Sequence, residues 1–286
     1  LARTEKVAAV VTYSGSDPVL ALAERANPHA TPIVAALATH PGVTQGNDYV
    51  SQTCFDNTVQ GQVAAYFVRD DLLIDRVAIF TSPENPYSTN LAAVFANQFA
   101  ALGGEVTDVV EIREGAPPLV ETLARVRQRA PELLYLPMTA GEVADVLRTA
   151  QRLNWSPMKM AGDGLLAGAI AQASRDLHVL EGLLATEFFH RLGQDTEFGK
   201  RARKAHSGSA TSYTAMGVEA FAILLDAMNR CDDPTDRECV NRQVRSTTDF
   251  EGLMGKISID AKGRAHRPVI INTIRNRGLK YVVKVY

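Results

Sequence analysis

The stretch Met160-Ala161-Gly162-Asp163-Gly164-Leu165-Leu166 joins a short apolar run to the start of a helical pattern. The apolar run predicts a buried strand, and the glycines that flank Asp163 predict a tight turn between this strand and the helix. Asp163 is therefore expected directly after the carboxyl end of the strand. In a sheet of parallel strands, ligands bind outside that end.

The same alternation of strand and helix patterns extends over most of the chain. The apolar runs are nearly continuous, which is typical of parallel strands covered on both faces. Between two of them, Tyr87–Leu102 has the period of an amphipathic helix, and Gly103-Gly104 predicts its end. The predicted strands are Val7–Val11, Ile33–Leu37, Val77–Phe80, Val106–Val110, Leu133–Leu136, Met158–Ala161 and Leu183–Thr186. The sequence thus predicts an α/β protein with a mostly parallel sheet.

The alternation stops in the last third of the chain. Residues Thr196–Ser246 show helical patterns only, and Ser212–Asn229 predicts one long helix. Its buried face is expected to consist of Phe221, Leu224, Leu225 and Met228. Three further strands are predicted at Lys256–Ile259, Val269–Ile274 and Lys280–Val285. No Gly/Ser-rich linker divides the sequence, so if the chain forms two lobes it must cross between them more than once.

Composition and charge exclude several classes of protein. The chain has 286 residues, of which 46% are hydrophobic and 22% are charged, as in an ordinary globular protein that is long enough for two lobes. A formal net charge of -2 argues against nucleic-acid binding, which usually requires a basic stripe. No apolar run reaches about 18 residues, so no membrane span is predicted. The sequence begins at Leu1, and we expect it to be processed or truncated.

Two of the three cysteines, Cys231 and Cys239, bracket a turn-rich loop between two helical patterns. A disulfide between them would close a short ring and contribute roughly 2–3 kcal/mol, and it would imply an oxidising compartment. Two reduced thiols in a cytosolic protein fit the spacing equally well. No partner His or Cys lies at zinc-site spacing, so a metal centre is not expected.

Three more polar side chains follow predicted strands in the way that Asp163 does, namely Ser16, Thr39 and Tyr87. Hydroxyl groups donate to a carboxylate, and a carboxylate accepts from an ammonium group, so the set suits a small zwitterion. This favours capture of a small molecule over chemistry performed on it. Each residue also has a purely structural interpretation, because serine, threonine and aspartate are common at turns and helix N-termini.

Two classes of enzyme are disfavoured. In a dinucleotide-binding protein the acid between Gly162 and Gly164 would repel a pyrophosphate at the helix N-terminus, and the glycine spacing is one residue too long. Ser16, Asp163 and His190 occur in the order of an α/β-hydrolase triad, but Ser16 lacks the flanking glycines of a nucleophile elbow. We therefore expect neither catalysis nor a cofactor.

Several stretches, taken in order along the chain, match one known family. They are Lys6-Val7-Ala8-Ala9-Val10-Val11, Thr31-Pro32-Ile33-Val34, Val59-Gln60-Gly61-Gln62, Arg76-Val77-Ala78-Ile79, Gly162-Asp163-Gly164 and Gly255-Lys256-Ile257-Ser258-Ile259-Asp260. In these the sequence resembles the periplasmic solute-binding proteins of ABC importers, of the leucine/isoleucine/valine-binding type (type I). Members of that family begin with a strand, a helix and a second strand that precede the position of Leu1, so the resemblance implies that these elements are missing here.

The resemblance implies two doubly wound α/β lobes with parallel sheets, joined by three crossovers. Lobe one would comprise residues 1–70 and 187–253, and lobe two would comprise residues 71–186 and 254–286. This division accounts for the helical segment and for the late strands.

The resemblance also assigns roles to the polar residues. Ser16 would bind the carboxylate of an amino acid, and Thr39 would contact its polar groups beside the main chain of Leu37. From the opposing lobe, Tyr87 would close on the ligand and Asp163 would pair with its α-ammonium group. The expected side-chain pocket consists of Phe55, Thr139 and Phe188. Because the family often has an aromatic residue where Thr139 stands, the identity of the ligand stays open.

The function implied by the resemblance is extracytoplasmic capture of an amino acid or a related carboxylate, followed by delivery to the membrane permease of an ABC importer. The alternatives are a ligand-sensing domain of a receptor or regulator with the same fold, and a binder of small aromatic carboxylates. A periplasmic location would favour the disulfide, so we expect Cys231 and Cys239 to be joined and Cys54 to keep its thiol.

Overall fold

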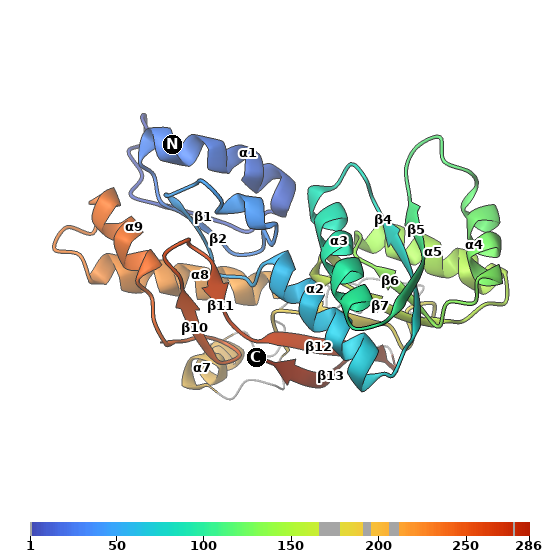
Figure 1. Ribbon diagram of the computed structural model, residues 1–286. Helices are drawn as coiled ribbons and strands as arrows, with labels where there is room; N and C mark the ends of the chain where they lie inside the picture. Colours follow the sequence, from blue (N-terminus) through green and yellow to red (C-terminus); the bar gives the residue numbers. More distant parts are fainter. Residues whose placement is uncertain (1, 166–177, 191–195, 206–211, 277) are drawn as a thin grey trace. The chain divides into compact units, whose positions relative to one another are not determined.

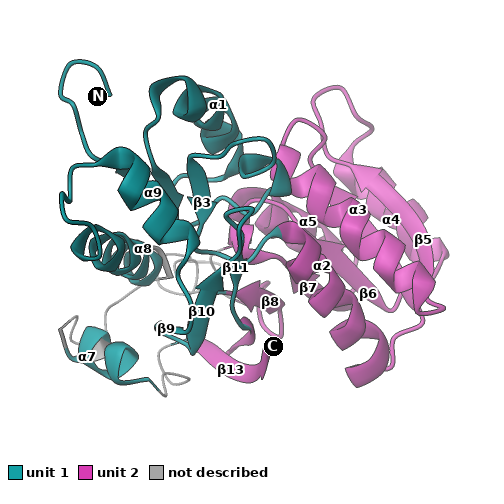
Figure 2. Ribbon diagram, turned by 60° about the vertical axis from the view of Figure 1, so that its left-hand side comes forward, with its two compact units in different colours: residues 1–56, 188–268, 286 teal, residues 57–187, 269–285 magenta. Residues whose placement is uncertain are grey.

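The computed structural model describes residues 2–165, 178–190, 196–205, 212–276 and 278–286, and the chain forms two compact units. Unit 1 contains residues 1–56, 188–268 and 286, and unit 2 contains residues 57–187 and 269–285 (Figure 2). The chain therefore passes from one unit to the other after residues 56, 187 and 268, and its last residue, 286, is again in unit 1. No helix in the described part of the chain is both long and apolar enough to span a membrane.

Unit 1 is built on a parallel sheet of three short strands. The order is β1 (Val10–Thr12), β2 (Ile33–Ala35) and β3 (Val50–Gln52). The helical elements of this unit are α1 (Ser16–Ala26), η1 (Asn27–His29), η2 (Pro41–Val43), α7 (Glu197–Ala205), α8 (Ser212–Asn229) and α9 (Arg237–Arg245). A small antiparallel sheet adds β9 (Phe250–Glu251), β10 (Lys256–Ile259) and β11 (Ala265–His266).

Unit 2 is built on a seven-stranded sheet in the order β13-β12-β8-β7-β6-β4-β5. Its strands are β4 (Arg76–Thr81), β5 (Glu105–Glu111), β6 (Leu133–Leu136), β7 (Met158–Ala161), β8 (Leu184–Glu187), β12 (Val269–Arg275) and β13 (Gly278–Val285). Strands β4 to β8 are parallel, whereas β12 and β13 add on in antiparallel orientation. The helical elements are α2 (Asn57–Tyr66), η3 (Phe67–Asp71), α3 (Pro86–Ala101), α4 (Leu119–Gln128), α5 (Ala140–Arg152) and η4 (Asp163–Leu165).

The inner strands β4 and β6 of the unit 2 sheet are buried on both faces, which explains why they are apolar at successive positions. Along β6, Leu133 and Tyr135 pack into a core with residues of α2 and α3, while Leu134 and Leu136 pack into a second core with residues of α4 and α5. This alternation follows from the two-residue period of a strand. Figure 1 shows α2 and α3 side by side, as their many mutual contacts require.

Apart from the single residues 187 and 286, the unit boundaries differ from the expected lobes at two places. Residues 57–70 lie in unit 2 because α2 packs closely on α3, where a Cβ at Gly61 would lie 2.7 Å from Cγ1 of Val94. Residues 254–268 lie in unit 1, where the Gln52 N–H donates to the Gly263 carbonyl at 2.7 Å. Close helix packing and main-chain pairing thus set these boundaries.

The predicted buried face of α8 is wrong in part. Phe221 and Leu225 are 58% and 46% exposed, although Leu224 is buried. The buried face consists instead of Ala215, Met216, Glu219, Ala220, Ile223, Leu224 and Ala227. The helix is apolar on more than one side, so its pattern alone selects no unique face.

Candidate functional site

In unit 2, Asp163 and Tyr87 lie together at the carboxyl end of β7. Asp163 begins η4 directly after Gly162, and Tyr87 lies in the first turn of α3. The Gly164 N–H donates to the Tyr87 hydroxyl at 2.9 Å. A Cβ at Gly162 would lie 2.3 Å from the Tyr87 hydroxyl oxygen, and one at Gly164 would lie 2.7 Å from the Tyr87 ring. The two glycines are therefore required for the tyrosine to reach Asp163.

Asp163 is buried and has two side-chain partners within unit 2. The Gln60 Nε2 donates to Asp163 Oδ1 at 2.5 Å, and the Tyr87 hydroxyl also hydrogen-bonds with the carboxylate. Burial raises the pKa of the Asp163 carboxyl to about 6, while the two hydrogen bonds act in the opposite direction. Burial and the charge of Asp163 hold the pKa values of Tyr87 and Tyr135 well above the ordinary value, so both phenols are neutral.

In unit 1, Ser16 lies beside the loop that carries Thr39. Ser16 is the first residue of α1, and its Oγ accepts a hydrogen bond from the His40 N–H at 3.1 Å. The Gln52 Nε2 holds the same loop by donating to the Ala38 carbonyl at 2.5 Å. Among the described residues, the fully buried Thr39 Oγ1 has no hydrogen-bond partner. Leu37, at the start of this loop, is also buried.

This corner of unit 1 presents several hydrogen-bond donors. The first N–H groups of a helix have no partner within the helix and attract negative charge. The Ser16 hydroxyl accepts from His40 and keeps its own proton for donation. The buried Thr39 hydroxyl offers a second donor.

The three residues expected in a side-chain pocket lie in two different settings. Phe55 and Phe188 are fully buried in unit 1, with ring centroids 4.4 Å apart, so each ring has the other as a packing partner. Thr139 lies in unit 2, where it caps α5. Its N–H and hydroxyl donate to the Glu142 carboxylate at 2.9 and 2.6 Å.

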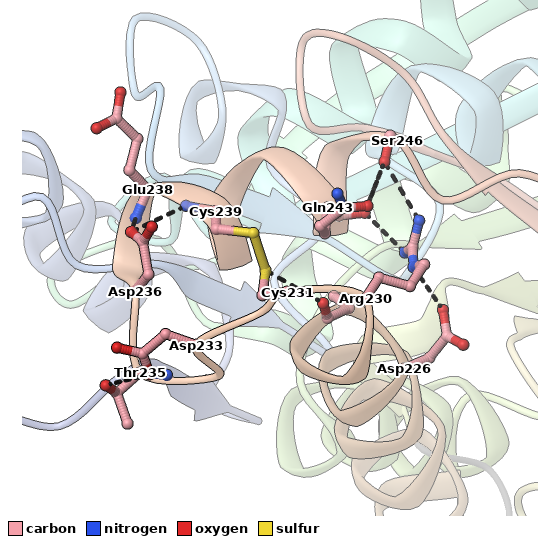
Figure 3. The surroundings of a disulfide bond; sticks show 11 residues. Asp226, Arg230, Cys231, Asp233, Thr235, Asp236, Glu238, Cys239, Gln243 and Ser246 are labelled. Atoms are coloured by element: carbon pink, nitrogen blue, oxygen red, sulfur yellow. Dashed lines mark hydrogen bonds and ion pairs between the residues drawn. A yellow bond between two sulfur atoms is a disulfide. The ribbon is translucent and has the colours of Figure 1, made fainter.

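A disulfide joins Cys231 to Cys239 across the loop between α8 and α9, with their Cα atoms 6.0 Å apart (Figure 3). Asp236 caps α9 by accepting from the Glu238 and Cys239 N–H groups at 3.0 and 3.2 Å.

Cys54 is buried elsewhere in unit 1, with its Sγ 3.4 Å from the Ala38 carbonyl oxygen. The described ranges contain no group of three acidic, His or Cys side chains that could hold a metal ion.

Asp163, Tyr87 and Gln60 form one hydrogen-bonded cluster in unit 2. Of these three residues, Gln60 was not identified as functional from the sequence. It lies within the Val59-Gln60-Gly61-Gln62 stretch, and 103 positions separate it from Asp163. A glutamine next to a glycine in an apolar helix gives only a weak signal of burial.

Comparison with known proteins agrees with the fold described above. The model of the periplasmic binding protein family matches residues 1–278, whereas no curated protein sequence matches. The leucine-binding protein LivK of Thermotoga maritima MSB8 is 31% identical with a TM-score of 0.91, over 99% of this chain and 81% of that one.

Two further solved structures are more distant in sequence. The branched-chain amino acid substrate-binding protein LivJ of Streptococcus pneumoniae, in complex with isoleucine, is 20% identical with a TM-score of 0.86, over 99% of this chain and 81% of that one. A solute-binding protein of Rhodopseudomonas palustris BisB5, in complex with 3,4-dihydroxybenzoic acid, is 17% identical with a TM-score of 0.82, over 99% and 79%. With its α/β architecture and mostly parallel sheets, the chain belongs to the periplasmic binding protein family and has the type I fold.

Proposed function

We propose that this protein is the solute-binding component of an ABC importer and that it captures a free amino acid outside the cytoplasm. The observation that carries the proposal is the buried Thr39 hydroxyl, which has no partner within the described residues. A buried polar group without a hydrogen bond is costly, and a ligand atom at Thr39 would supply the missing partner. The likeness to the leucine-binding protein of Thermotoga maritima supports the same class of ligand.

The ligand carboxylate would bind in unit 1. The N-terminus of α1, the Ser16 hydroxyl and the Thr39 hydroxyl are all donors, and an ionised carboxylate is an acceptor only. Hydrogen bonds to a charged group are about twice as strong as those between neutral groups. Three donors from one rigid corner therefore suit a carboxylate better than a sugar or a nucleobase.

The ligand ammonium group would bind to unit 2 through Asp163. This carboxylate is buried, and a buried charge is strongly stabilised by an opposite charge. A ligand that contacts Ser16 and Thr39 of one unit and Tyr87 and Asp163 of the other favours the arrangement of the units that it bridges. We propose that a membrane permease recognises this ligand-bound form, and that the protein performs no chemistry.

A small aromatic carboxylate is the second candidate ligand. Asp163 already accepts hydrogen bonds from Gln60 and Tyr87. Because its pKa is raised, the carboxyl is more readily protonated and can then stay buried without a cationic partner. An aromatic acid would bind to the donors of unit 1 and make no contact with Asp163. The Rhodopseudomonas palustris protein in complex with 3,4-dihydroxybenzoic acid has the same fold.

A thermal-shift panel tests the proposal. The panel contains the free amino acids, benzoate, 3,4-dihydroxybenzoate, sugars and nucleotides. A ligand at about 100 times its dissociation constant adds about 2.7 kcal/mol of stability, which is readily seen as a higher melting temperature. We expect one or a few amino acids to stabilise the protein. Stabilisation by an aromatic acid, a sugar or a nucleotide with no response to any amino acid would refute the assignment.

A further inference from the structure

Gln60 has no role in the function proposed above, yet its amide is fully buried against the key carboxylate. We propose that Gln60 is a positioning residue for Asp163, holding one carboxylate oxygen through its Nε2 so that the carboxylate faces the ammonium group of the ligand. This inference rests on the proposed function, because it assigns Asp163 to the ligand. It adds a residue of α2 to the unit 2 part of the site, which otherwise consists of residues from the starts of α3 and η4.

The packing of α2 explains how Gln60 reaches Asp163. Gly61 allows α2 to approach α3 so closely that any side chain there would meet Val94. The Asn57 Nδ2 donates to the Tyr87 carbonyl at 3.2 Å, which fixes the first turn of α2 against the first turn of α3. Residues one turn apart on α2 therefore hold both site residues, Asn57 through the Tyr87 main chain and Gln60 through the Asp163 side chain.

The amide of Gln60 also has an unused acceptor. An ionised carboxylate cannot donate, so the amide must direct Nε2 at Asp163. In the described residues, the buried Oε1 of Gln60 then has no hydrogen-bond partner. This oxygen lies beside the turn that carries Asp163, since a Cβ at Gly162 would be 3.1 Å from it. A ligand ammonium group has three N–H donors. We propose that one of them donates to Gln60 Oε1 while another donates to the Asp163 carboxylate.

The hydrogen bond from Gln60 also affects the charge of Asp163. Within the part of the chain that the structure describes, the titratable side chains that interact with Asp163 are Tyr87 from α3 and Tyr135 from β6, and both are neutral phenols. Gln60 and Tyr87 thus oppose the effect of burial, which disfavours the ionised carboxylate. Removal of Gln60 should raise the pKa of Asp163 above about 6. An ammonium ligand requires the ionised form, so its affinity is lost as the pH falls through that pKa.

The first experiment needs no ligand. The ¹³C carboxyl signal of Asp163, identified by its absence in Asp163→Asn, is titrated in the wild type, in Gln60→Leu and in Gln62→Leu. Gln62 is exposed on the same helix and serves as the matched control. We expect the pKa of Asp163 to rise by about one unit or more in Gln60→Leu and to stay unchanged in Gln62→Leu. An unchanged pKa in Gln60→Leu overturns the proposal.

The second experiment measures the affinity for L-leucine at pH 7 and pH 8.5. A pKa raised to between about 7 and 8 predicts that the affinity of Gln60→Leu relative to wild type is about two- to tenfold lower at pH 7 than at pH 8.5, where only the loss of the orienting hydrogen bond and of the Oε1 acceptor remains. A loss that is equal at both pH values indicates a merely structural role and contradicts the proposal. If the wild type binds no amino acid, the proposed function fails, while the carboxyl titration still decides the role of Gln60.

Gln60→Glu covers the case in which Gln60→Leu does not fold. The introduced carboxyl has the same shape as the amide and would share a proton with Asp163 at neutral pH. We then expect two coupled titration steps, of which the upper lies above the wild-type pKa. A single Asp163 titration at the wild-type value would show that the two side chains do not interact, and it would reject the proposal.

Discussion

The guanidinium of Arg267 and the carboxylate of Glu219 form an ion pair that is almost completely buried in unit 1, with side chains 1% and 0% exposed. Arg267 also donates to the Thr53 and Phe188 carbonyls at 2.8 and 3.3 Å, and Glu219 accepts from the Leu253 N–H at 2.6 Å. Thr53, Phe188 and Arg267 each lie close to a point at which the chain leaves or enters unit 1. The ion pair and the hydrogen bonds of Arg267 thus link the chain near these three crossing points.

Arg267→Met tests the contribution of this ion pair to stability. The substitution leaves the Glu219 carboxylate buried without its cationic partner, which should cost about 3–5 kcal/mol of unfolding free energy. Arg264→Met is the control, since Arg264 pairs with Asp260 at 3.1 Å through a side chain that is 39% exposed. Such a pair contributes about 0–1 kcal/mol. Urea unfolding monitored by circular dichroism compares the two variants, and equal losses would contradict our interpretation of the buried pair.

Asp163→Asn tests the ligand assignment. Asparagine keeps the size of the side chain but removes its charge, so a ligand ammonium group would be buried without a counter-ion. We expect a loss of about 2–5 kcal/mol in the binding free energy of an amino acid, mostly through faster dissociation. Calorimetry measures the affinity. If Asp163 served only to start η4, asparagine would replace it well and binding would not change.

The same variant tests the pH dependence of stability. Because the pKa of Asp163 is about 6 in the folded protein and about 4 in an unfolded chain, the folded state binds more protons between these values. This contribution favours the folded state at low pH and is lost as the pH rises from about 4 to 6. Relative to Asp163→Asn, the wild type should lose on the order of 3 kcal/mol of unfolding free energy over that range. A difference between the two proteins that does not vary with pH would show that Asp163 titrates normally.

The sequence predicted the bounds of β6, β7 and β10 accurately. Strand β6 is apolar and buried at every position, whereas β7 and β10 alternate apolar with polar residues and are bounded by turns, and both patterns are local. Strand β3 reads Val-Ser-Gln and was not predicted. Its Ser51 and Gln52 are buried all the same, since the main chain pairs with β2 and the Gln52 side chain holds the neighbouring loop.

The candidate site was predictable only where a residue follows a strand. Asp163 and Tyr87 were proposed for one cluster because each comes after a strand of a parallel sheet, and the structure brings them together. Gln60 lies inside a helix, so its pairing with Asp163 depends on how α2 packs against α3. No local pattern contains that information. Thr139, which stays a predicted pocket residue, is the cap of α5, and the Glu142 three residues later is the local pattern that predicts this capping role.

The disulfide can be checked by counting thiols. The unfolded, unreduced protein should show one reactive thiol per chain, that of Cys54, because Cys231 and Cys239 are joined. The Cys231→Ser/Cys239→Ser double variant should lose roughly 2–3 kcal/mol of unfolding free energy, since the bond closes a short loop. A count of three thiols would remove both the bond and the argument that it makes for an oxidising compartment.

Gly162→Ala tests whether the close approach of Tyr87 to the Asp163 turn matters for binding. The added methyl group would lie 2.3 Å from the Tyr87 hydroxyl oxygen and 2.8 Å from Cδ2 of Leu91, so the tyrosine must move away from Asp163. Overpacking of this kind costs about 1–3 kcal/mol of stability, and the displaced phenol should also weaken amino-acid binding. Gly141→Ala is the matched control, because a Cβ there meets nothing within 4 Å and alanine favours the helix. Thermal unfolding measures the loss of stability in both variants, and calorimetry measures the loss of amino-acid affinity. Wild-type stability and affinity in Gly162→Ala would show that the close approach of Tyr87 to the Asp163 turn matters for neither.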